Sequence, residues 1–564
     1  MEMTKTKLFF YTVAVLLGIT FNACSKDENE VDPELLVSID QLDITKEGTE
    51  KTFILSSNVE WSIEGGQEWC TVSPTSGTSG DTPVKISVSA NNSTDQRIAT
   101  LLIKAADLSE EISIMQAANH QLTLSKNEIE LDDQAQEFSV AYEASGSVEV
   151  EIIGDWISQK SNSSDAPIFE IENNYTLFAR DGSITFTLGD LSETVSITQI
   201  GKAATIPSDM TGVESNASTL ASKMVAGWNI GNTMEVPKNN GGETGWGNPM
   251  VRKTLIDAVK AAGFNAVRIP CAWDSYIVDQ TTYRISDTWF TRVKEVVDYC
   301  YNNDMYVILN IHWDGGWLED NPTYDKQEEI NKKQEALWQQ IAVYFRDYNE
   351  KLLFAGTNEV HSDYNTPSTE NLKVQQSFNQ TFVDAVRATG GKNANRNLIV
   401  QTYNTNIAHG VNYHNMPNDV VDNRLMLEVH YYDPWDFCGQ TDSGYKSQWG
   451  EGYTDVSSWG QEDYLNDQFG SVKTNFVDHG IPVILGEYGA LIRSSLTGEA
   501  LEKHIASHSY YLKTVTKVAK ENGMVPFIWD NGYTGNNGFG LFDRNNGSIV
   551  HEDAVNAIIS GAIE

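Results

Sequence analysis

Cysteine and positive charge are both scarce in this sequence, and each shortage excludes a class of protein. Only five of the 564 residues are cysteines, and apart from Cys24 they are scattered without the spacing of a metal site or a disulfide framework. Lysine and arginine number 39 against 78 acidic residues, which gives a net charge of −39. A chain this acidic repels nucleic acid, so we expect no nucleic-acid partner.

Long hydrophobic runs are also rare, and the one at residues 8–20 is too short to be a confident transmembrane span. It follows two lysines and so has the form of an export signal. Residues 21–24, Phe-Asn-Ala-Cys, resemble a bacterial lipoprotein cleavage site, although phenylalanine replaces the usual leucine. We therefore expect a signal peptide over residues 1–23 and a lipid on Cys24.

The acidic segment 24–32 is expected to be a linker, and it resembles the surface-export signal of Bacteroidetes lipoproteins. No other segment is apolar for long enough to anchor the chain. The sequence thus predicts an exported outer-membrane lipoprotein at the cell surface, in contact with the membrane only through its lipid anchor. The alternative is plain secretion with Cys24 unmodified.

Short alternating strands dominate residues 32–201. Examples are residues 52–55, 84–88 and 184–188, separated by turns rich in Gly, Ser, Asn and Asp. This pattern is typical of β-sandwiches. The segment Glu-Ile-Ser-Ile-Met-Gln ending at Gln116 returns as Thr-Val-Ser-Ile-Thr-Gln ending at Gln199, a period of 83 residues. We therefore expect two Ig-like sandwich domains, over residues 33–118 and 119–201.

Eight strand-like runs follow in the C-terminal region, each succeeded by sequence with helical apolar spacing. The runs are residues 224–230, 266–269, 306–311, 352–357, 397–401, 425–429, 482–485 and 525–528. The helical spacing is clearest in residues 251–262, 289–302, 334–348, 374–387 and 507–521. Eight such units predict a (β/α)8 TIM barrel, which we place at residues 205–564.

Glu359 and Glu487 follow the fourth and seventh runs. The C-terminal ends of the strands form the active face of such a barrel, so the two carboxylates can meet across its mouth. A close carboxylate pair can supply the acid and the nucleophile for hydrolysis of an acetal, which is glycosidase chemistry. For a single strand-end glutamate an ion pair is an equally good explanation. Further polar and aromatic residues at the same strand ends favour a site: Arg268, His312, Asn358, His430, Tyr432 and Trp529.

These residues resemble glycoside hydrolase family 5, a family of (β/α)8 retaining glycosidases. The resemblance covers about residues 206–564 and depends on eight segments: 227–233 (GWNIGNT), 243–249 (ETGWGNP), 263–270 (GFNAVRIP), 310–313 (NIHW), 358–359 (NE), 430–432 (HYY), 486–489 (GEYG) and Trp529. The first two are most similar to subfamily 4, whose members are mostly endo-β-1,4-glucanases, some preferring xyloglucan. Residues 312–314, His-Trp-Asp, depart from that subfamily, which often has a second His and a Glu there.

The resemblance implies a role for each matched residue. Glu359 would be the general acid/base and Glu487 the nucleophile that forms the glycosyl-enzyme. Asn358 would bind the sugar 2-hydroxyl, while Arg268 and Tyr432 would keep Glu487 ionised.

The remaining matched residues would surround the sugar. His430 would lie near the acid, His312 would bind the sugar, and Trp529 would form the floor beneath the distorted ring. Four further tryptophans are weaker candidates for outer subsites, since each can equally serve packing: Trp246, Trp313, Trp317 and Trp435.

The first sandwich also resembles a known family, the BACON domain of Bacteroidetes carbohydrate-active proteins, through Trp61-Ser-Ile63 and residues 69–77. The second, with Asp155-Trp-Ile157, is a weaker match. The family name points to carbohydrate binding, but these tryptophans occupy positions where a sandwich core needs large side chains. We therefore expect the two domains to act as spacers.

Taken together, these features predict a retaining endo-acting enzyme that cleaves β-1,4-glucosidic bonds of plant cell-wall β-glucan. We expect a monomer that needs no metal or organic cofactor. Within the same chemistry, a xyloglucan-specific endoglucanase or a β-mannanase is the alternative. From a different class, the chain could be a surface glycan-binding protein on an inactive barrel.

Overall fold

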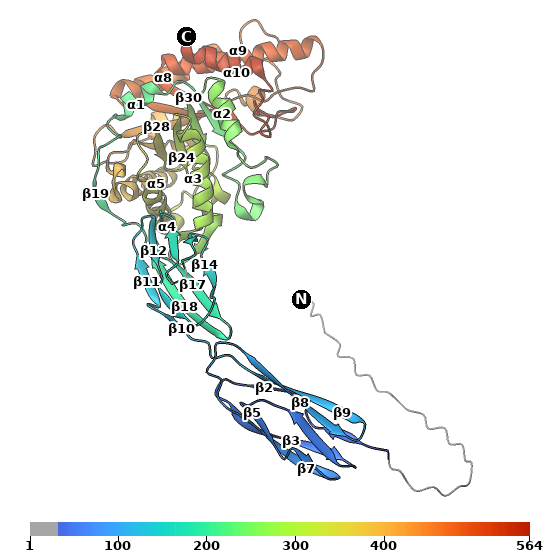
Figure 1. Cartoon of the computed structure of the whole chain (residues 1–564). Helices are drawn as coiled ribbons and strands as arrows, with labels where there is room; N and C mark the ends of the chain where they lie inside the picture. The colour runs from blue at the N-terminus through green and yellow to red at the C-terminus, as the bar shows by residue number, and fades with distance from the viewer. Residues whose placement is uncertain (1–31, 164) are drawn as a thin grey trace, which may run out of the picture.

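The computed structural model describes residues 32–163 and 165–564, which form two β-sandwiches followed by a barrel, arranged in a row (Figure 1). The expected signal peptide, the lipid site at Cys24 and nearly all of the acidic linker lie outside these residues. Within the part of the chain that the structure describes, no helix has both the length and the hydropathy needed to cross a membrane.

The first sandwich packs a four-stranded sheet on a five-stranded sheet. The first has the order β1 (Leu35–Val37), β3 (Thr49–Ser57), β7 (Gly80–Val88), β5 (Cys70–Ser73), and the second β2 (Gln41–Ile44), β9 (Leu108–Gln116), β8 (Arg97–Ala105), β4 (Trp61–Gly65), β6 (Ser76–Gly77). Buried residues alternate with more exposed ones along β8, so one face of the strand packs into the core. Trp61 is buried in that core and Trp69 packs against it.

The second sandwich is smaller and has three sheets. They are β10 (Leu122–Leu124) with β13 (Tyr142–Ala144); β11 (Glu128–Leu131), β18 (Leu191–Gln199), β17 (Arg180–Leu188) and β14 (Glu149–Ile153); and β12 (Gln136–Ser139), β16 (Ile168–Ile171) and β15 (Ile157–Ser161). Trp156 is buried in its core.

The repeat detected in the sequence is a structural repeat. In the first copy the Nε of Arg97 donates to Oε1 of Gln116 at 2.8 Å, and its guanidinium lies 4.3 Å from the ring centre of Trp69. In the second copy Arg180 makes the same bond to Gln199 at 2.8 Å and lies 4.5 Å from Trp156. The last strand of each copy is therefore held by the same arginine, glutamine and tryptophan.

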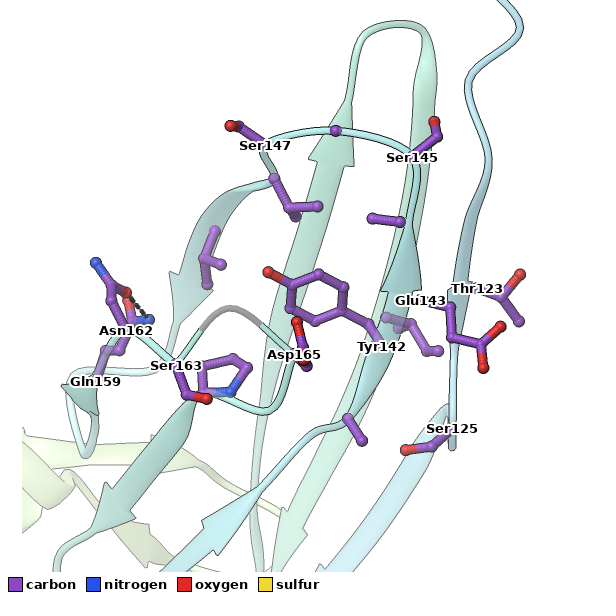
Figure 2. Close-up of a pocket in the computed structure, with 17 residues that line it drawn as sticks. Thr123, Ser125, Tyr142, Glu143, Ser145, Ser147, Gln159, Asn162, Ser163 and Asp165 are labelled. Atoms are coloured by element: carbon purple, nitrogen blue, oxygen red, sulfur yellow. Dashed lines mark hydrogen bonds between the residues drawn. The ribbon is translucent and has the colours of Figure 1, made fainter. Parts of the chain in front are cut away.

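The two copies differ at one end. The strand β3 of the first copy runs unbroken for nine residues, whereas the second copy has the shorter β12 and β13 in its place. A hollow of about 1220 Å³ opens beside β13, with the ring of Tyr142 inside it (Figure 2). It lies in the second sandwich and contains none of the residues expected to act on substrate.

The C-terminal region is a closed barrel of eight parallel strands, as predicted. Its strands are β20 (Gly227–Ile230), β21 (Ala266–Ile269), β24 (Tyr306–Asn310), β25 (Leu352–Ala355), β27 (Leu398–Gln401), β28 (Leu425–Tyr431), β29 (Val483–Tyr488) and β30 (Met524–Asp530). Every one of the eight runs found in the sequence contributes a strand, in the same order. All four residues of β20, β21, β25 and β27 are buried, because helices cover the barrel from outside.

Each expected helix is present. The helices are α1 (Ala217–Lys223), α2 (Lys253–Ala261), α3 (Asp287–Tyr301), α4 (Tyr324–Tyr344), α5 (Thr369–Ala388), α6 (Ile407–Tyr413), α7 (Trp435–Cys438), α8 (Glu462–Asn475), α9 (Glu499–Glu521) and α10 (Glu552–Ile563). Of those expected, α2 lies within its expected range, whereas α3, α4, α5 and α9 begin earlier than expected. The prediction of a helix from residue 334 missed the first ten residues of α4. That half is mostly polar and buries only Ile330, so the apolar period is absent there.

The second sandwich is docked on the flank of the barrel. The rings of Tyr175 and Tyr344 lie 5.7 Å apart, and the Arg284 guanidinium lies 5.2 Å from the ring centre of Phe178. Lys202, which is only 8% exposed, pairs with Asp347. The connecting strand β19 (Ile206–Ser208) then pairs with β26 (Gly390–Gly391). Side chains of the second sandwich and the connecting strand β19 thus both contact the rest of the barrel domain.

Candidate active site

The structure brings Glu359 and Glu487 together at the C-terminal mouth of the barrel. Glu359 lies four residues beyond the end of β25, and Glu487 lies in β29. One carboxylate oxygen of each and a ring nitrogen of His430 all lie within 4.8 Å of one another. This close spacing is typical of retaining glycosidases, whose carboxyl groups are roughly 5 Å apart, and leaves no room for a water between them.

A local irregularity in β29 aims Glu487 at the site. Val429 pairs with Leu485, but the next residue, His430, pairs with Glu487, so Gly486 is an extra residue in the strand. Because side chains alternate along a strand, this shift turns Glu487 to the face that His430 occupies. Gly486 must lack a side chain, since a β-carbon there would overlap Oε1 of Glu428.

Arg268, at the end of β21 and fully buried, connects the expected nucleophile to its neighbours. Its Nη1 donates to Oε1 of Glu487 at 3.0 Å and to Oδ1 of Asn229 at 3.0 Å, and its Nη2 donates to Oδ1 of Asn358 at 2.8 Å. On the other oxygen of Glu487, the hydroxyl of Tyr432 donates at 3.0 Å. Glu487 thus accepts one bond from each side.

His430 is placed between three carboxyl groups. Its Nδ1 lies 2.6 Å from Oε1 of Glu359 and 3.7 Å from Oε2 of Glu487, and its Nε2 lies 3.3 Å from Oε1 of Glu428. Burial alone would lower the pKa of His430, but the three acids raise it to about 10.

Glu428 is a buried anion that the sequence analysis gave no role. It is 0% exposed, its Oε1 lies 2.9 Å from Nε of Arg268, and its Oε2 accepts from Nε2 of Gln401 at 2.6 Å. Burial would raise its pKa, yet Arg268 and His430 lower it. A charged residue inside the apolar run Leu-Met-Leu-Glu-Val was the one available signal, because buried charges need partners.

Counting charges identifies one mobile proton. Arg268 and His430 carry two positive charges among the three carboxyl groups Glu359, Glu428 and Glu487. Glu428 stays ionised, so neutrality requires a single proton on the Glu359/Glu487 pair, as a coupled acid and nucleophile need.

His312 and Trp529, which are expected to contact the sugar, lie side by side with their rings stacked, the centres 5.9 Å apart and the planes at 7°. Nδ2 of Asn310 lies 3.2 Å from Nδ1 of His312. Burial lowers the pKa of His312 well below its usual range, so the ring is neutral. Accepting on Nδ1 leaves its Nε2–H free to donate.

The departure at residues 312–314 has a structural explanation. Asp314 is buried and its Oδ2 accepts the backbone N–H groups of Trp273 and Asp274 and the Nε1–H of Trp317, at 2.8, 2.7 and 3.1 Å. It therefore orders the loop after β24 instead of facing the sugar, and burial raises its pKa to about 7.

The four weaker tryptophan candidates divide into two kinds. Trp246, 41% exposed, lies beside Trp313 with ring centres 6.1 Å apart, and Trp435 is 56% exposed. Trp317 is bound by Asp314, and Lys333 lies 4.3 Å from its ring centre. The first three offer open aromatic faces, whereas Trp317 serves the loop.

Two groups of side chains among the described residues have ligand atoms close enough to hold a metal ion. They are Glu359 with His430 and Glu487, and Glu319 with Asp320 and His361. In the first, His430 already bridges the carboxylates and Arg268 lies 3.0 Å from Glu487. A cation would be repelled by both, so this donor set fits proton chemistry and not a metal.

A closed (β/α)8 barrel with two close carboxylates at strand ends four and seven defines a retaining glycosidase. Comparison with known proteins identifies the family. Residues 230–535 match the family model for cellulase, glycosyl hydrolase family 5, and residues 59–117 and 148–199 match the model for BACON, a putative N-terminal binding domain. The chain belongs to glycosyl hydrolase family 5, and it is an endo-acting β-1,4-glucan hydrolase.

The individual relatives cover different parts of the chain. A xyloglucan-specific endo-β-1,4-glucanase of Bacteroides ovatus is 36% identical over 97% of this chain and 95% of its own. Endoglucanase A of Paenibacillus barcinonensis is 40% identical over 61% of this chain and 90% of its own. Among solved structures, a Bacteroides ovatus xyloglucanase with a bound XXXG heptasaccharide covers 94% of this chain and all of its own, at 35% identity and a TM-score of 0.61.

Proposed function

We propose that Glu359 is the general acid/base and Glu487 the nucleophile of a double displacement. The observation that carries this proposal is that ligand atoms of both carboxylates and of His430 lie within 4.8 Å of one another at the barrel mouth, although the fourth and seventh strands supply the carboxylates. Glu487 attacks the anomeric carbon while Glu359 protonates the leaving oxygen. Water, activated by Glu359, then releases the sugar with its β configuration retained.

The neighbouring residues have supporting roles in the same proposal. Arg268 and Tyr432 hold Glu487 and favour its ionised form, and Asn358, aligned by Arg268, binds the 2-hydroxyl. Trp529 is the floor of the subsite that holds the distorted ring, and His312 donates to the sugar from its Nε2–H.

The proton must reside on Glu359 before the first step, and His430 supplies the route. In the unliganded site burial raises the pKa of Glu487, whereas the pKa of Glu359 is lowered because the hydrogen bond and charge of His430 outweigh burial. This order is the reverse of what the first step needs. A relay through His430 corrects it: Nδ1 of His430 gives its proton to Glu359 across the 2.6 Å contact and takes up the proton of Glu487, whose Oε2 lies 3.7 Å away. His430 ends protonated as it began, and Arg268 and Tyr432 stabilise the ionised Glu487 that results.

The substrate we propose is a plant cell-wall β-glucan, with xyloglucan as the preferred polysaccharide. A relative matched over 97% of this chain is named as xyloglucan-specific. Xyloglucanases from Paenibacillus pabuli and a ruminal source share 41% and 39% identity with the barrel. The second candidate is broad specificity among β-glucans, since similar structures from Ruminococcus champanellensis and Bacteroides salanitronis are named broad specificity endoglucanases.

We also propose that the chain is an exported, surface-exposed outer-membrane lipoprotein, anchored through Cys24, and that it acts as a monomer. The basis is the sequence of the N-terminal 24 residues. Changing Cys24 to Ala should release the protein from the membrane fraction, and continued retention would contradict the anchor.

The catalytic assignment is tested with two variants. Glu487→Ala should lose several orders of magnitude in kcat while binding oligosaccharide normally. Glu359→Ala should be inactive on polysaccharide, but azide should rescue it on an activated aryl glycoside and yield the β-glycosyl azide. An α-azide would reverse the two roles, and proton NMR showing an initial α-anomer from wild type would contradict retention.

A further inference from the structure

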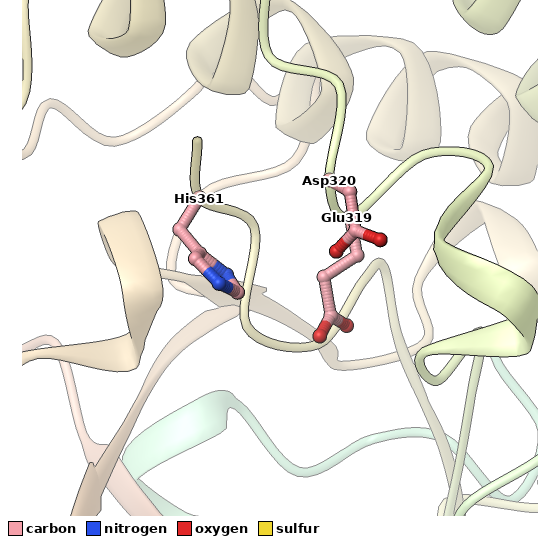
Figure 3. A group of neighbouring side chains, drawn as sticks. All are labelled: Glu319, Asp320 and His361. Atoms are coloured by element: carbon pink, nitrogen blue, oxygen red, sulfur yellow. The ribbon is translucent and has the colours of Figure 1, made fainter. Parts of the chain in front are cut away.

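Glu319 is a buried carboxylate beside the reaction centre for which the mechanism above has no use. It lies in the loop between β24 and α4, the loop that also carries His312 and Trp313, and it is 5% exposed. Its backbone carbonyl accepts the N–H of His361 at 2.9 Å. Figure 3 shows Glu319 and Asp320 on one loop and His361 on the neighbouring one.

The carboxylate of Glu319 makes both of its hydrogen bonds to the acid/base segment. Its Oε2 accepts from Nδ2 of Asn358 at 3.2 Å and from the backbone N–H of Glu359 at 3.2 Å. Asn358 is thus bound at both ends of its amide, since Arg268 donates to its Oδ1 at 2.8 Å. One Nδ2–H of Asn358 remains for the sugar, and its direction is set by the other.

His361 completes the attachment of this segment. Its Nδ1 lies 2.5 Å from the backbone carbonyl of Glu359. Residues 358–361 are therefore joined to Glu319 at three points and to each other at a fourth. Displacement of the loop after β24 would be transmitted directly to the carboxylate of Glu359.

Burying the carboxyl group of Glu319 without a cation costs free energy, which argues against a role in packing alone. No salt bridge to Glu319 exists among the described residues, and the titratable groups around it are Glu359, Asp320 and His361. Burial, then the charge of Glu359, raise the pKa of Glu319 to about 8. An uncompensated buried acid is retained where it serves a site, because packing alone would favour an apolar residue.

We propose that Glu319 is a positioning residue for the glycosidase reaction: it fixes the amide of Asn358 and the backbone of Glu359, and couples both to the loop that binds the sugar. The proposal depends on the roles given above to Asn358 and Glu359. Above about pH 8, where Glu319 ionises, its charge also opposes ionisation of Glu359, because like charges nearby disfavour one another.

The alternative is that Glu319, Asp320 and His361 bind a cation. Oε2 of Glu319 already accepts two N–H groups, and Nδ1 of His361 is engaged by the carbonyl of Glu359. A metal would have to displace these bonds, so the hydrogen-bonded role is favoured.

The test compares Glu319→Ala and Glu319→Gln with Asp320→Asn, a matched control on the adjacent exposed carboxylate that touches neither Asn358 nor Glu359. On xyloglucan or mixed-linkage glucan, Glu319→Ala should lower kcat about 30-fold with KM within about threefold, because two hydrogen bonds are lost. Glu319→Gln retains an acceptor and should lose less than about tenfold. Asp320→Asn should match wild type.

Two readouts distinguish positioning from general destabilisation. On a dinitrophenyl glycoside, whose leaving group needs no proton, Glu319→Ala should lose far less in the glycosylation step than on polysaccharide. Glu319 ionises above about pH 8, and its charge then holds the proton on Glu359; because Glu319→Gln cannot ionise, the alkaline limb of its pH–rate profile above pH 8 should move to lower pH. Equal losses on both substrates with an unshifted profile would overturn the proposal.

Further outcomes distinguish a failure of the Glu319 proposal from a failure of the acid/base role proposed for Glu359. Glu359→Gln is assayed in parallel: if it remained active, the acid/base assignment itself would be wrong. If it were inactive while both Glu319 variants behaved as wild type, only the positioning role would fail. If chelator lowered wild-type activity and Ca²⁺ restored it, but not in Glu319→Gln, Glu319 would be a metal ligand instead.

Discussion

At the scale of single residues, the site depends on a few buried charges that share partners. Glu428 contacts both cations, Arg268 and His430; Arg268 pairs with Glu487 and His430 with Glu359. The positions of the proposed acid and nucleophile therefore depend on one shared anion.

Glu428→Gln tests this shared support. Removing one partner of a buried ion pair leaves uncompensated charge, so we expect a loss of about 3 kcal/mol in the free energy of unfolding. The pKa of His430 should fall from about 10, since one of three anions is gone. Urea denaturation and NMR titration of the imidazole measure the two effects. An unchanged His430 pKa would contradict the contact.

His430 also predicts a pH dependence of stability. Its pKa is raised to about 10 in the folded protein, against roughly 6.5 in an unfolded chain. The folded state therefore binds the proton more tightly, and the resulting stability is complete below pH 6.5 and lost as pH rises toward 10. Midpoints of unfolding at pH 6 and pH 9.5 should differ less in His430→Gln than in wild type. An equal fall in both proteins would exclude His430 as the cause.

At the scale of elements, the strand β29 shows how one glycine directs a side chain. Gly486→Ala would drive a β-carbon into Glu428, so the bulge must shift or the carboxylate must move. We expect at least tenfold lower kcat together with a lower melting temperature, because overpacking costs roughly 1–3 kcal/mol. Ala490, beyond the strand, offers a control in Ala490→Gly, which should leave kcat nearly unchanged.

The sequence predicted the barrel well because each of its strands is a mainly apolar run followed by a helical period. It also placed Glu359, Glu487, Arg268 and Tyr432 at strand ends, where the structure brings them together. The polar half of α4 was missed because it faces solvent. The bulge at Gly486 and the bonds of Glu319 involve residues distant in the chain, and no local period records such contacts.

At the scale of the whole molecule, the second sandwich and the barrel share an interface that the first sandwich does not. Tyr175, Phe178 and Lys202 contact the barrel side chains Tyr344, Arg284 and Asp347. The fold changes from sandwich to barrel between residues 201 and 205, but side chains of the two domains pack together across this boundary.

Two truncations measure this interface. A chain starting at residue 205 should fold and hydrolyse soluble glucan. Its barrel should melt about 3–6 °C lower than the barrel of the full-length chain, because it loses one aromatic pair and a cation–π contact with the second sandwich. A chain starting at residue 119 should keep the melting temperature of the barrel. Equal melting of both truncated barrels would show that the interface contributes nothing.

The docked sandwich has a consequence for how the barrel can be oriented if the chain is anchored through Cys24 as we propose. If the first sandwich rotates relative to the second, the barrel moves together with the second sandwich. Rotation of the barrel relative to the second sandwich would instead break the Tyr175 and Lys202 contacts. The angle between the second sandwich and the barrel mouth is therefore fixed by these contacts. The first sandwich can then change its orientation without altering the angle between the second sandwich and the barrel mouth.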